Sequence, residues 1–188
     1  TQKDSLQEYI RFLDPICTEL ERALIYKQVL QSDIKHMQQF LYNFWYEKDP
    51  LAAEEAWLNY KDEVIKVNEA YKTITKPGYM SDRGRVYLKY GPPNAIAESY
   101  HEPHAYPYEI WHYYQLDNQR NKKFVFYTTE LATNDFQLIH SDAIGEVNNY
   151  RWQMEIHNRP GLDRMDVDNS NVYEHWGSKI EDYYNNPR

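Results

Sequence analysis

The side chains of this chain that could do chemistry are mainly carboxylates. Glycoside hydrolysis needs two carboxyl groups about 5–10 Å apart, and Glu98, Glu102, Glu109 and Asp135 could supply such a pair. The sequence contains neither a Gly-x-Ser-x-Gly nucleophile motif nor a glycine-rich phosphate loop. Because acidic residues are common along the chain and no nucleophile motif accompanies them, we expect no catalytic residue and leave enzyme activity open.

Histidine, carboxylate and cysteine side chains are the candidates for metal binding. His101 and His104 are weak candidates, because Pro103 breaks the helix that would place both imidazoles on one face. We favour a polar exposed loop there, and a loop site completed by a carboxylate is the alternative. Residues 166–170 are similar to a calcium loop but lack its glycine and its final glutamate. The single cysteine, Cys17, excludes an internal disulfide and is expected to be a buried structural thiol. We therefore expect no metal and no cofactor.

The densest group of glycine, hydroxyl and charged residues lies between positions 78 and 85. Ser81 and Asp82 can bond nearby backbone N–H groups as a helix cap or an Asx turn, and Gly84 allows a close approach of the backbone. Arg83 and Arg85 would share one face of a strand, and such a pair could clamp a carboxylate or a phosphate. We favour a structural corner between a helix and a strand, with the anion clamp and a catalytic role as alternatives. With two downstream residues, the motif core is Gly78, Tyr79, Ser81, Asp82, Arg83, Gly84, Arg85, Glu109 and Trp111.

Four helices are predicted upstream of this motif from apolar residues at helical spacing. Asp14-Pro15 and Asp49-Pro50 are typical of helix starts, and Ser32 or Asp33 is the expected cap of the third helix. Lys76-Pro77-Gly78 is expected to end the fourth. The predicted helices cover residues 6–13, 16–24, 34–44 and 50–74.

Downstream, the period changes to the alternation that is typical of strands. If the first two predicted strands pair, Arg85 and Glu109 could meet across the ladder. Short helices are expected over residues 147–154 and near Ile180. The predicted strands cover residues 85–90, 108–114, 123–129 and 136–140, with a polar hairpin loop over residues 116–122.

Together these elements predict an α+β fold. An N-terminal helical segment is followed by a four-stranded antiparallel sheet and by short C-terminal helices. We divide the chain into a helical arm (residues 1–76), the sheet with the motif (residues 77–145) and a helical or irregular segment (residues 146–188). We expect the three parts to form one structural unit.

The composition excludes several classes of protein. The chain has 188 residues and a formal net charge of −8, which argues against nucleic-acid binding because Lys and Arg neutralise phosphates. No apolar run approaches the ~20 residues of a membrane helix, so we expect no transmembrane segment. The 19 Tyr and 5 Trp can each bury ~150–250 Å² and still offer a polar group. We therefore expect a core rich in tyrosine hydroxyls, which need hydrogen-bond partners when buried.

A resemblance to a known family rests on residues 78–93, which read Gly-Tyr-Met-Ser-Asp-Arg-Gly-Arg-Val-Tyr-Leu-Lys-Tyr-Gly-Pro-Pro. This segment resembles the signature of the GWxTD domain family, which is named for Gly-Trp-x-Thr-Asp. Tyr79 stands in place of the tryptophan and Ser81 in place of the threonine. The resemblance runs from about Phe40 to Glu146. Collinear matches are Phe44-Trp45, Asp49-Pro50, Pro107-Tyr108-Glu109-Ile110-Trp111, Lys123-Phe124-Val125-Phe126 and Asp135-Phe136-Gln137-Leu138-Ile139-His140-Ser141.

The resemblance implies a bacterial protein that is periplasmic, envelope-associated or secreted, and it implies no particular reaction. Because longer members carry an N-terminal portion, a chain that begins at Thr1 is expected to be a fragment. We therefore expect a non-catalytic interaction or assembly module with a protein partner in the bacterial envelope and no nucleic acid. The alternative is a glycan-binding or glycan-cleaving domain that uses surface Tyr and Trp with paired carboxylates.

Overall fold

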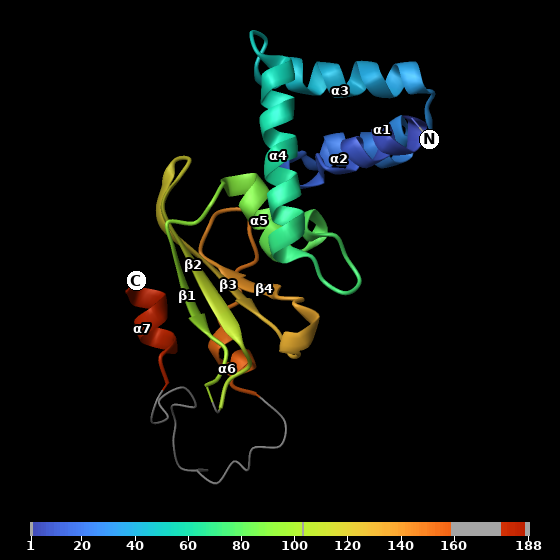
Figure 1. Cartoon of the computed structure of the whole chain (residues 1–188). Coiled ribbons are helices and arrows are strands. Elements are labelled where there is room, and N and C mark those ends of the chain that lie inside the picture. The colour runs from blue at the N-terminus through green and yellow to red at the C-terminus, as the bar shows by residue number, and fades with distance from the viewer. Residues whose placement is uncertain (1, 103, 159–177, 187–188) are drawn as a thin grey trace.

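The structure is a computed structural model that describes residues 2–102, 104–158 and 178–186. A helical arm occupies one end of the molecule, a sheet occupies the other, and helix α4 runs from the arm toward the sheet (Figure 1). The arm comprises α1 (Gln2–Arg11), α2 (Glu19–Lys27), α3 (Ile34–Lys48) and α4 (Ala53–Tyr71). It is followed by α5 (Asp82–Tyr90), β1 (Ala95–Ser99), β2 (Tyr108–Leu116), β3 (Gln119–Tyr127), β4 (Gln137–Ser141), α6 (Trp152–Ile156) and α7 (Ile180–Asn185). Short 3-10 helices lie at Asp14–Ile16, Val29–Gln31, Gly78–Met80 and Leu131–Thr133.

Side-chain caps determine where the arm helices begin. Thr18 and Glu21 form a reciprocal capping box at the start of α2, in which Thr18 N donates to Glu21 Oε2 at 2.7 Å and Glu21 N donates to Thr18 Oγ1 at 3.3 Å. Asp33 caps α3 by accepting a hydrogen bond from His36 N at 2.9 Å, which confirms one of the two predicted caps. Pro15 begins only a 3-10 turn, because the capping box three residues later starts the second helix instead.

Apolar side chains at helical spacing hold the arm together. Ile10, Ile25 and Met37 are fully buried between α1, α2 and α3. Val64 and Val67 of α4 are also buried, in a cluster that includes Tyr79 of the Gly78–Met80 turn and Leu88 of α5. Burial of each such side chain stabilises the fold by about 1.5–3 kcal/mol, so packing rather than surface charge maintains the arm.

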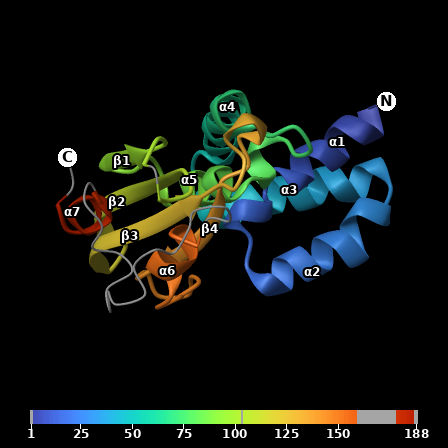
Figure 2. The same ribbon diagram turned by 90° about the horizontal axis from the view of Figure 1, so that it is seen from below.

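The sheet has the order β1-β2-β3-β4, and each neighbouring pair is antiparallel. Because side chains of a strand alternate between faces, Trp111 packs with Val86 of α5, whereas Ile110 packs with Ile156 of α6 and Ile180 of α7. Figure 2 shows α4 on one side of the sheet and α6 on the other. The sheet is therefore the middle layer between the arm side and the C-terminal helices.

The predicted strand over residues 85–90 is wrong, because these residues form most of α5. Their alternation arises from the position of α5 between two layers: Val86 packs toward the sheet and Leu88 packs toward the arm. A short apolar run of this kind fits a strand and a buried helix equally well. The helix is favoured over the strand because Ser81 caps it: the Ser81 side chain accepts a hydrogen bond from Gly84 N at the start of α5. The remaining strand of the four-stranded sheet is β1, which was not predicted from the sequence.

The predicted α+β class is confirmed, with N-terminal helices, a four-stranded antiparallel sheet and short C-terminal helices. The three later predicted strands correspond to β2, β3 and β4. The fourth predicted helix ends earlier than expected, at Tyr71, and the helix expected over residues 147–154 is the shorter α6. The boundaries drawn at residues 76 and 145 stay a prediction, and residues 166–170 lie outside the described residues. No helix in the described ranges is both long and apolar enough to cross a membrane.

Two motif glycines allow close backbone contacts from α4 to the 3-10 turn Gly78–Met80, and from that turn to α5. A Cβ atom at Gly78 would lie 2.2 Å from the Val67 carbonyl oxygen, and a Cβ atom at Gly84 would lie 1.9 Å from the Gly78 carbonyl oxygen. Both distances are far below any van der Waals contact, so no side chain fits at either position. These glycines therefore set the distance between α4 and α5.

We expect Gly84→Ala to lower the free energy of unfolding by about 3 kcal/mol, the upper end of the range for overpacking, because two backbone segments would have to separate. Equilibrium urea unfolding measures this change. Asn59→Ala, at an exposed position of α4, is the control and should stay within about 0.5 kcal/mol of the wild type. Equal stability of both variants would contradict the close contact.

Candidate functional site

Residues 78–85 of the motif core form the corner between α4 and α5. Ser81 Oγ accepts a hydrogen bond from Gly84 N at 3.1 Å and donates one to the Gly78 carbonyl oxygen at 2.7 Å. Tyr79 N donates to Asn68 Oδ1 of α4 at 3.0 Å. This corner is fastened by local polar bonds, as turn and cap chemistry predicts.

Two further motif side chains reach elements distant in the sequence. The Tyr79 ring packs against Phe12 at the end of α1, with ring centroids 5.1 Å apart. Asp82 Oδ2 accepts a hydrogen bond from Leu138 N of β4 at 2.7 Å. The motif thus connects the arm, α5 and the edge strand β4.

Arg83 forms a buried ion pair with Glu109 of β2. Arg83 Nη1 donates to Glu109 Oε1 at 2.7 Å, and the two side chains are only 6% and 4% exposed. Arg83 Nη2 donates to the Asn134 carbonyl oxygen at 3.0 Å. The Arg83 Cζ atom lies over the rings of Tyr71 and Phe136, at 5.1 and 4.2 Å from their centroids, a favourable environment for a cation.

Both carboxylate oxygens of Glu109 accept further hydrogen bonds. Tyr100 Oη donates to Glu109 Oε1 at 2.8 Å, and Trp111 Nε1 donates to Oε2 at 2.9 Å. Burial, and after it the charge of Glu109, raise the pKa of Tyr100. The phenol therefore stays protonated and acts as a hydrogen-bond donor to the carboxylate.

Arg85 pairs with Glu146, not with Glu109, so the predicted Arg85–Glu109 contact is wrong. Arg85 Nη2 donates to Glu146 Oε2 at 2.8 Å, while Lys89 Nζ and Tyr90 Oη donate to Oε1 at 2.8 and 2.6 Å. Burial opposes the charge of Glu146, but these three hydrogen bonds outweigh it and lower the pKa of Glu146 to about 2. Glu146 therefore fastens α5 to the connection between β4 and α6.

The helical conformation separates the two motif arginines. Arg83 and Arg85 would share a face on a strand. On a helix, residues i and i+2 point in directions that differ by about 200° around the axis. Each guanidinium is neutralised by a carboxylate of the same chain. The geometry therefore gives no pair of guanidinium groups aimed at one external anion.

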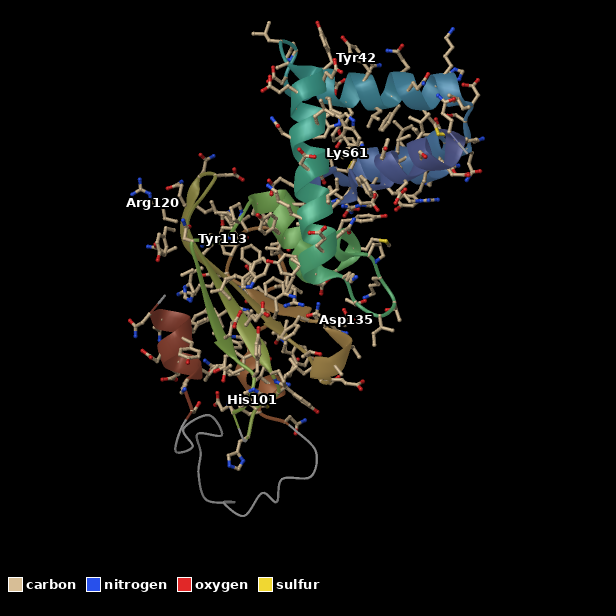
Figure 3. All side chains as sticks on the ribbon, in the orientation of Figure 1. Tyr42, Lys61, His101, Tyr113, Arg120 and Asp135 are labelled. Atoms are coloured by element: carbon tan, nitrogen blue, oxygen red, sulfur yellow. The ribbon has the colours of Figure 1, made fainter. Side chains whose placement is uncertain are left out.

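The histidine candidates of the sequence lie apart from this corner. His101 is exposed and points away from the molecule at the end of the sheet (Figure 3), and His104 is also exposed. Within the described ranges, no group of three His, Cys, Asp or Glu side chains has the arrangement of a metal site. Cys17 is half-buried, and burial followed by the charges of Glu21 and Asp14 raises its pKa to about 12, so its thiol is not activated.

The four candidate carboxylates are dispersed over three environments. Glu98 is exposed and lies directly opposite Glu109 in the β1–β2 register. Glu102 is buried: its Oε2 accepts from Tyr108 Oη at 3.0 Å, and its Oε1 lies 3.7 Å from His157 Nε2. Asp135 Oδ2 lies 3.6 Å from the Lys76 ammonium group. Glu102, Glu109 and Asp135 are therefore engaged within the fold.

Two open clefts of about 330 Å³ each border these residues. One lies at the end of β1 and includes Glu98, Tyr100 and Glu102. The other is lined by threonines of residues 73–75 and 128–133, together with Asp135. Neither cleft contains Arg83 or Glu109, so the buried motif pair does not open into either.

Three residues that were not predicted from the sequence contact charged side chains of this region: Asn134 and Glu146 bind motif arginines, and His157 lies beside Glu102. Asn134 adopts a left-handed conformation, with φ 56°, and its amide donates to the Lys72 carbonyl oxygen at 3.0 Å while its own carbonyl oxygen accepts from Arg83. An asparagine before a strand is typical of such turns. Glu146 and His157 carry no local signal, because their partners lie far away in the sequence.

The comparison with known proteins agrees with the motif. A family model described as GWxTD domain matches residues 2–158, which is most of the chain. No curated protein and no solved structure matches significantly. The match includes the arm as well as the sheet.

We expect Arg83→Met to lower the free energy of unfolding by about 3–5 kcal/mol, because the buried Glu109 carboxylate loses its positive partner. The double variant Arg83→Met/Glu109→Gln should be more stable than Arg83→Met. An amide is uncharged and its oxygen can still accept a hydrogen bond from Tyr100 or Trp111. Urea unfolding of the single and double variants measures this coupling. Arg120→Met, at an exposed hairpin position (Figure 3), is the control, and an unchanged Arg83→Met protein would refute the structural role.

Glu146 should make the stability depend on acidic pH. Its pKa is lowered from 4.5 to about 2 in the folded state, so its contribution is complete above the unfolded pKa and is lost as the pH falls from about 5 toward 2. We expect this loss to reach about 2–3 kcal/mol. Urea unfolding at several pH values should show that Glu146→Gln removes this dependence, whereas Glu47→Gln on the exposed side of α3 keeps it. Identical pH profiles for Glu146→Gln and wild type would contradict the assignment.

Proposed function

The chain belongs to the GWxTD domain family, and on this premise we propose that it is a non-catalytic interaction or assembly module. We further propose that the protein is periplasmic, envelope-associated or secreted in a bacterium and binds a protein partner there. The location is supported by the family resemblance, and the absence of catalytic roles by the geometry of the motif.

The main support for the proposal is that the charged motif side chains are bonded to other parts of the same chain. Arg83 and Arg85 pair with Glu109 and Glu146, and Asp82 accepts a hydrogen bond from the backbone of β4. A group that transfers a proton must lie within hydrogen-bond reach of the substrate, whereas the Arg83 and Glu109 side chains are almost completely buried. These contacts join α5 to the sheet and to the connection after β4, which supports a rigid scaffold rather than a reaction.

The helical arm offers exposed apolar side chains to a partner. Tyr42 and Tyr46 stack on α3 with ring centroids 5.8 Å apart, and Figure 3 shows Tyr42 pointing away from the arm. Tyrosine suits protein interfaces because its ring supplies contact area and its hydroxyl a hydrogen bond. The exposed large apolar residues of the arm are Leu20, Leu24, Tyr26, Tyr42, Tyr46, Leu51, Leu58 and Ile65.

The glycan alternative has one supporting observation. Glu98 and Glu109 lie opposite each other on neighbouring strands, a separation that suits a carboxylate pair. However, Arg83 Nη1 lies 2.7 Å from Glu109 Oε1, so cleavage would require this buried ion pair to open. We therefore favour the interaction module and treat glycan binding or cleavage as an outcome of its test.

Site-specific photo-cross-linking in cells that produce the full protein tests the proposed function. A photoreactive residue replaces Leu20, Tyr42 or Leu58 on three arm helices, or Arg120 on the hairpin between β2 and β3 as the control. We expect at least one arm position, but not Arg120, to cross-link to one envelope or secreted protein. The purified partner should then form a complex of defined mass with the chain in light scattering.

Two results would contradict the proposed function. The first is that none of the three arm positions cross-links to an envelope or secreted protein. The second is oligosaccharide binding or release of reducing sugar by the purified chain, which would favour the glycan alternative.

A further inference from the structure

Helix α4 carries a second amphipathic pattern on its solvent side, which we call the α4 outer face. It consists of an apolar series and an acidic series, each with a spacing of seven residues. Because seven residues make almost two helical turns, each series forms a stripe along the helix, and the two stripes are adjacent. The apolar series is Leu51, just before the helix, with Leu58 and Ile65, and the acidic series is Glu55, Asp62 and Glu69.

The apolar series is open to solvent. Its members are 98%, 49% and 47% exposed in chain order, whereas Val64 and Val67 on the other side of the same helix are 0% and 1% exposed. Figure 2 looks along α4 and shows it at the rim of the molecule. The helix therefore has one apolar face in the core and a second, narrower one outside it.

The acidic series is not used by the fold. Glu63, a neighbour on the helix surface, pairs with Lys66 at 2.6 Å and accepts a hydrogen bond from Tyr87. In the part of the chain that the structure describes, the three carboxylates of the acidic series form no hydrogen bond or ion pair of this kind, and Asp62 acts on Lys66 only through its charge. Side chains beside an apolar stripe at this spacing correspond to the flanking positions of a coiled coil, where opposite charges select the partner.

The charge of the α4 outer face argues against a second copy of this chain as the occupant. Two such faces in contact would bring acidic side chains together, and like charges at these positions are destabilising. A basic partner instead neutralises the three carboxylates. The net charge of −8 would further accelerate its association with the chain.

We propose that the α4 outer face binds a basic amphipathic helix of a partner protein. Leu or Ile side chains of the partner pack along the apolar series, and its Lys or Arg side chains pair with the acidic series. The 19 residues of α4 span about 28 Å, so a partner helix of similar length covers the face. This inference rests on the proposed function and names the surface and the partner chemistry.

Two synthetic helical peptides of about 20 residues test the proposal. Both have Leu at the coiled-coil core positions, and the flanking positions are all Lys in one and all Glu in the other. Fluorescence anisotropy measures their binding to the purified chain. We expect the Lys peptide to bind at least about tenfold more tightly than the Glu peptide, and high salt to reduce the difference.

Charge-reversal variants separate this face from general attraction to an acidic protein. Reversal of the acidic series to Lys should reverse the peptide preference. The control reverses Glu8, Glu19 and Glu47, which are exposed on α1, α2 and α3, and so makes the same change in net charge. This control should keep the preference for the Lys peptide.

Apolar variants test the other stripe. Leu58→Gln/Ile65→Gln should weaken binding of the Lys peptide at least about tenfold. Leu20→Gln/Leu24→Gln, which removes two exposed leucines from α2, should change it less than about twofold. Circular dichroism verifies that each variant remains folded.

Three results would overturn the proposal: equal binding of both peptides or none, equal effects of the α4 and control variants, or self-association of the wild type that Leu58→Gln/Ile65→Gln abolishes. The proposed function is tested separately. A partner that cross-links through Leu20 or Tyr42, and that Leu58→Gln/Ile65→Gln still binds, would overturn only this inference.

Discussion

The buried ion pair between Arg83 and Glu109 is the interaction on which the rest of the structure depends. Removal of two charges from water costs several kcal/mol per ion, and a close partner offsets this cost only when the remaining hydrogen-bonding groups are also satisfied. The Asn134 carbonyl oxygen accepts from Nη2 of Arg83, whereas Tyr100 and Trp111 donate to Glu109, and Nε of Arg83 is buried without a hydrogen-bond partner among the described residues. These residues come from α5, the sheet and two loops, so all of these elements must be in place together. The ion pair therefore specifies how α5 lies on β2 more than it adds net stability.

The glycine contact and the Glu146 cluster extend this constraint to the whole molecule. Gly78 brings the 3-10 turn against the backbone of α4, and Gly84 brings α5 against Gly78. Arg85 and Lys89 connect α5 to Glu146 beyond β4. Helix α5 is thus attached to the arm on one side and to the sheet on the other. A joint built in this way presents the arm at a fixed angle, which is the physical basis for interpreting the chain as a scaffold with an open helical surface.

The sequence by itself determined the elements whose signals are local. The cap at Asp33, the apolar spacing of the arm helices and the alternation of the three later strands each act within a few residues, so they could be recognised without the fold. The family followed from the motif, and the expected tyrosine-rich core followed from composition. Tyr108 and Tyr113, for example, are buried and donate to Glu102 and to the Gly91 carbonyl oxygen, because a buried hydroxyl requires a partner.

Only the tertiary structure decided the conformation and the partners of the motif. Residues 85–90 satisfy the periods of a strand and of a helix buried on two sides, and the surrounding layers select the helix. That selection turns Arg83 and Arg85 to different carboxylates, Glu109 and Glu146, which lie 26 and 61 residues away in the sequence. Such pairings depend on how layers stack and on how much water they exclude. A linear pattern contains neither quantity, and therefore the motif's residues could be predicted but their contacts could not.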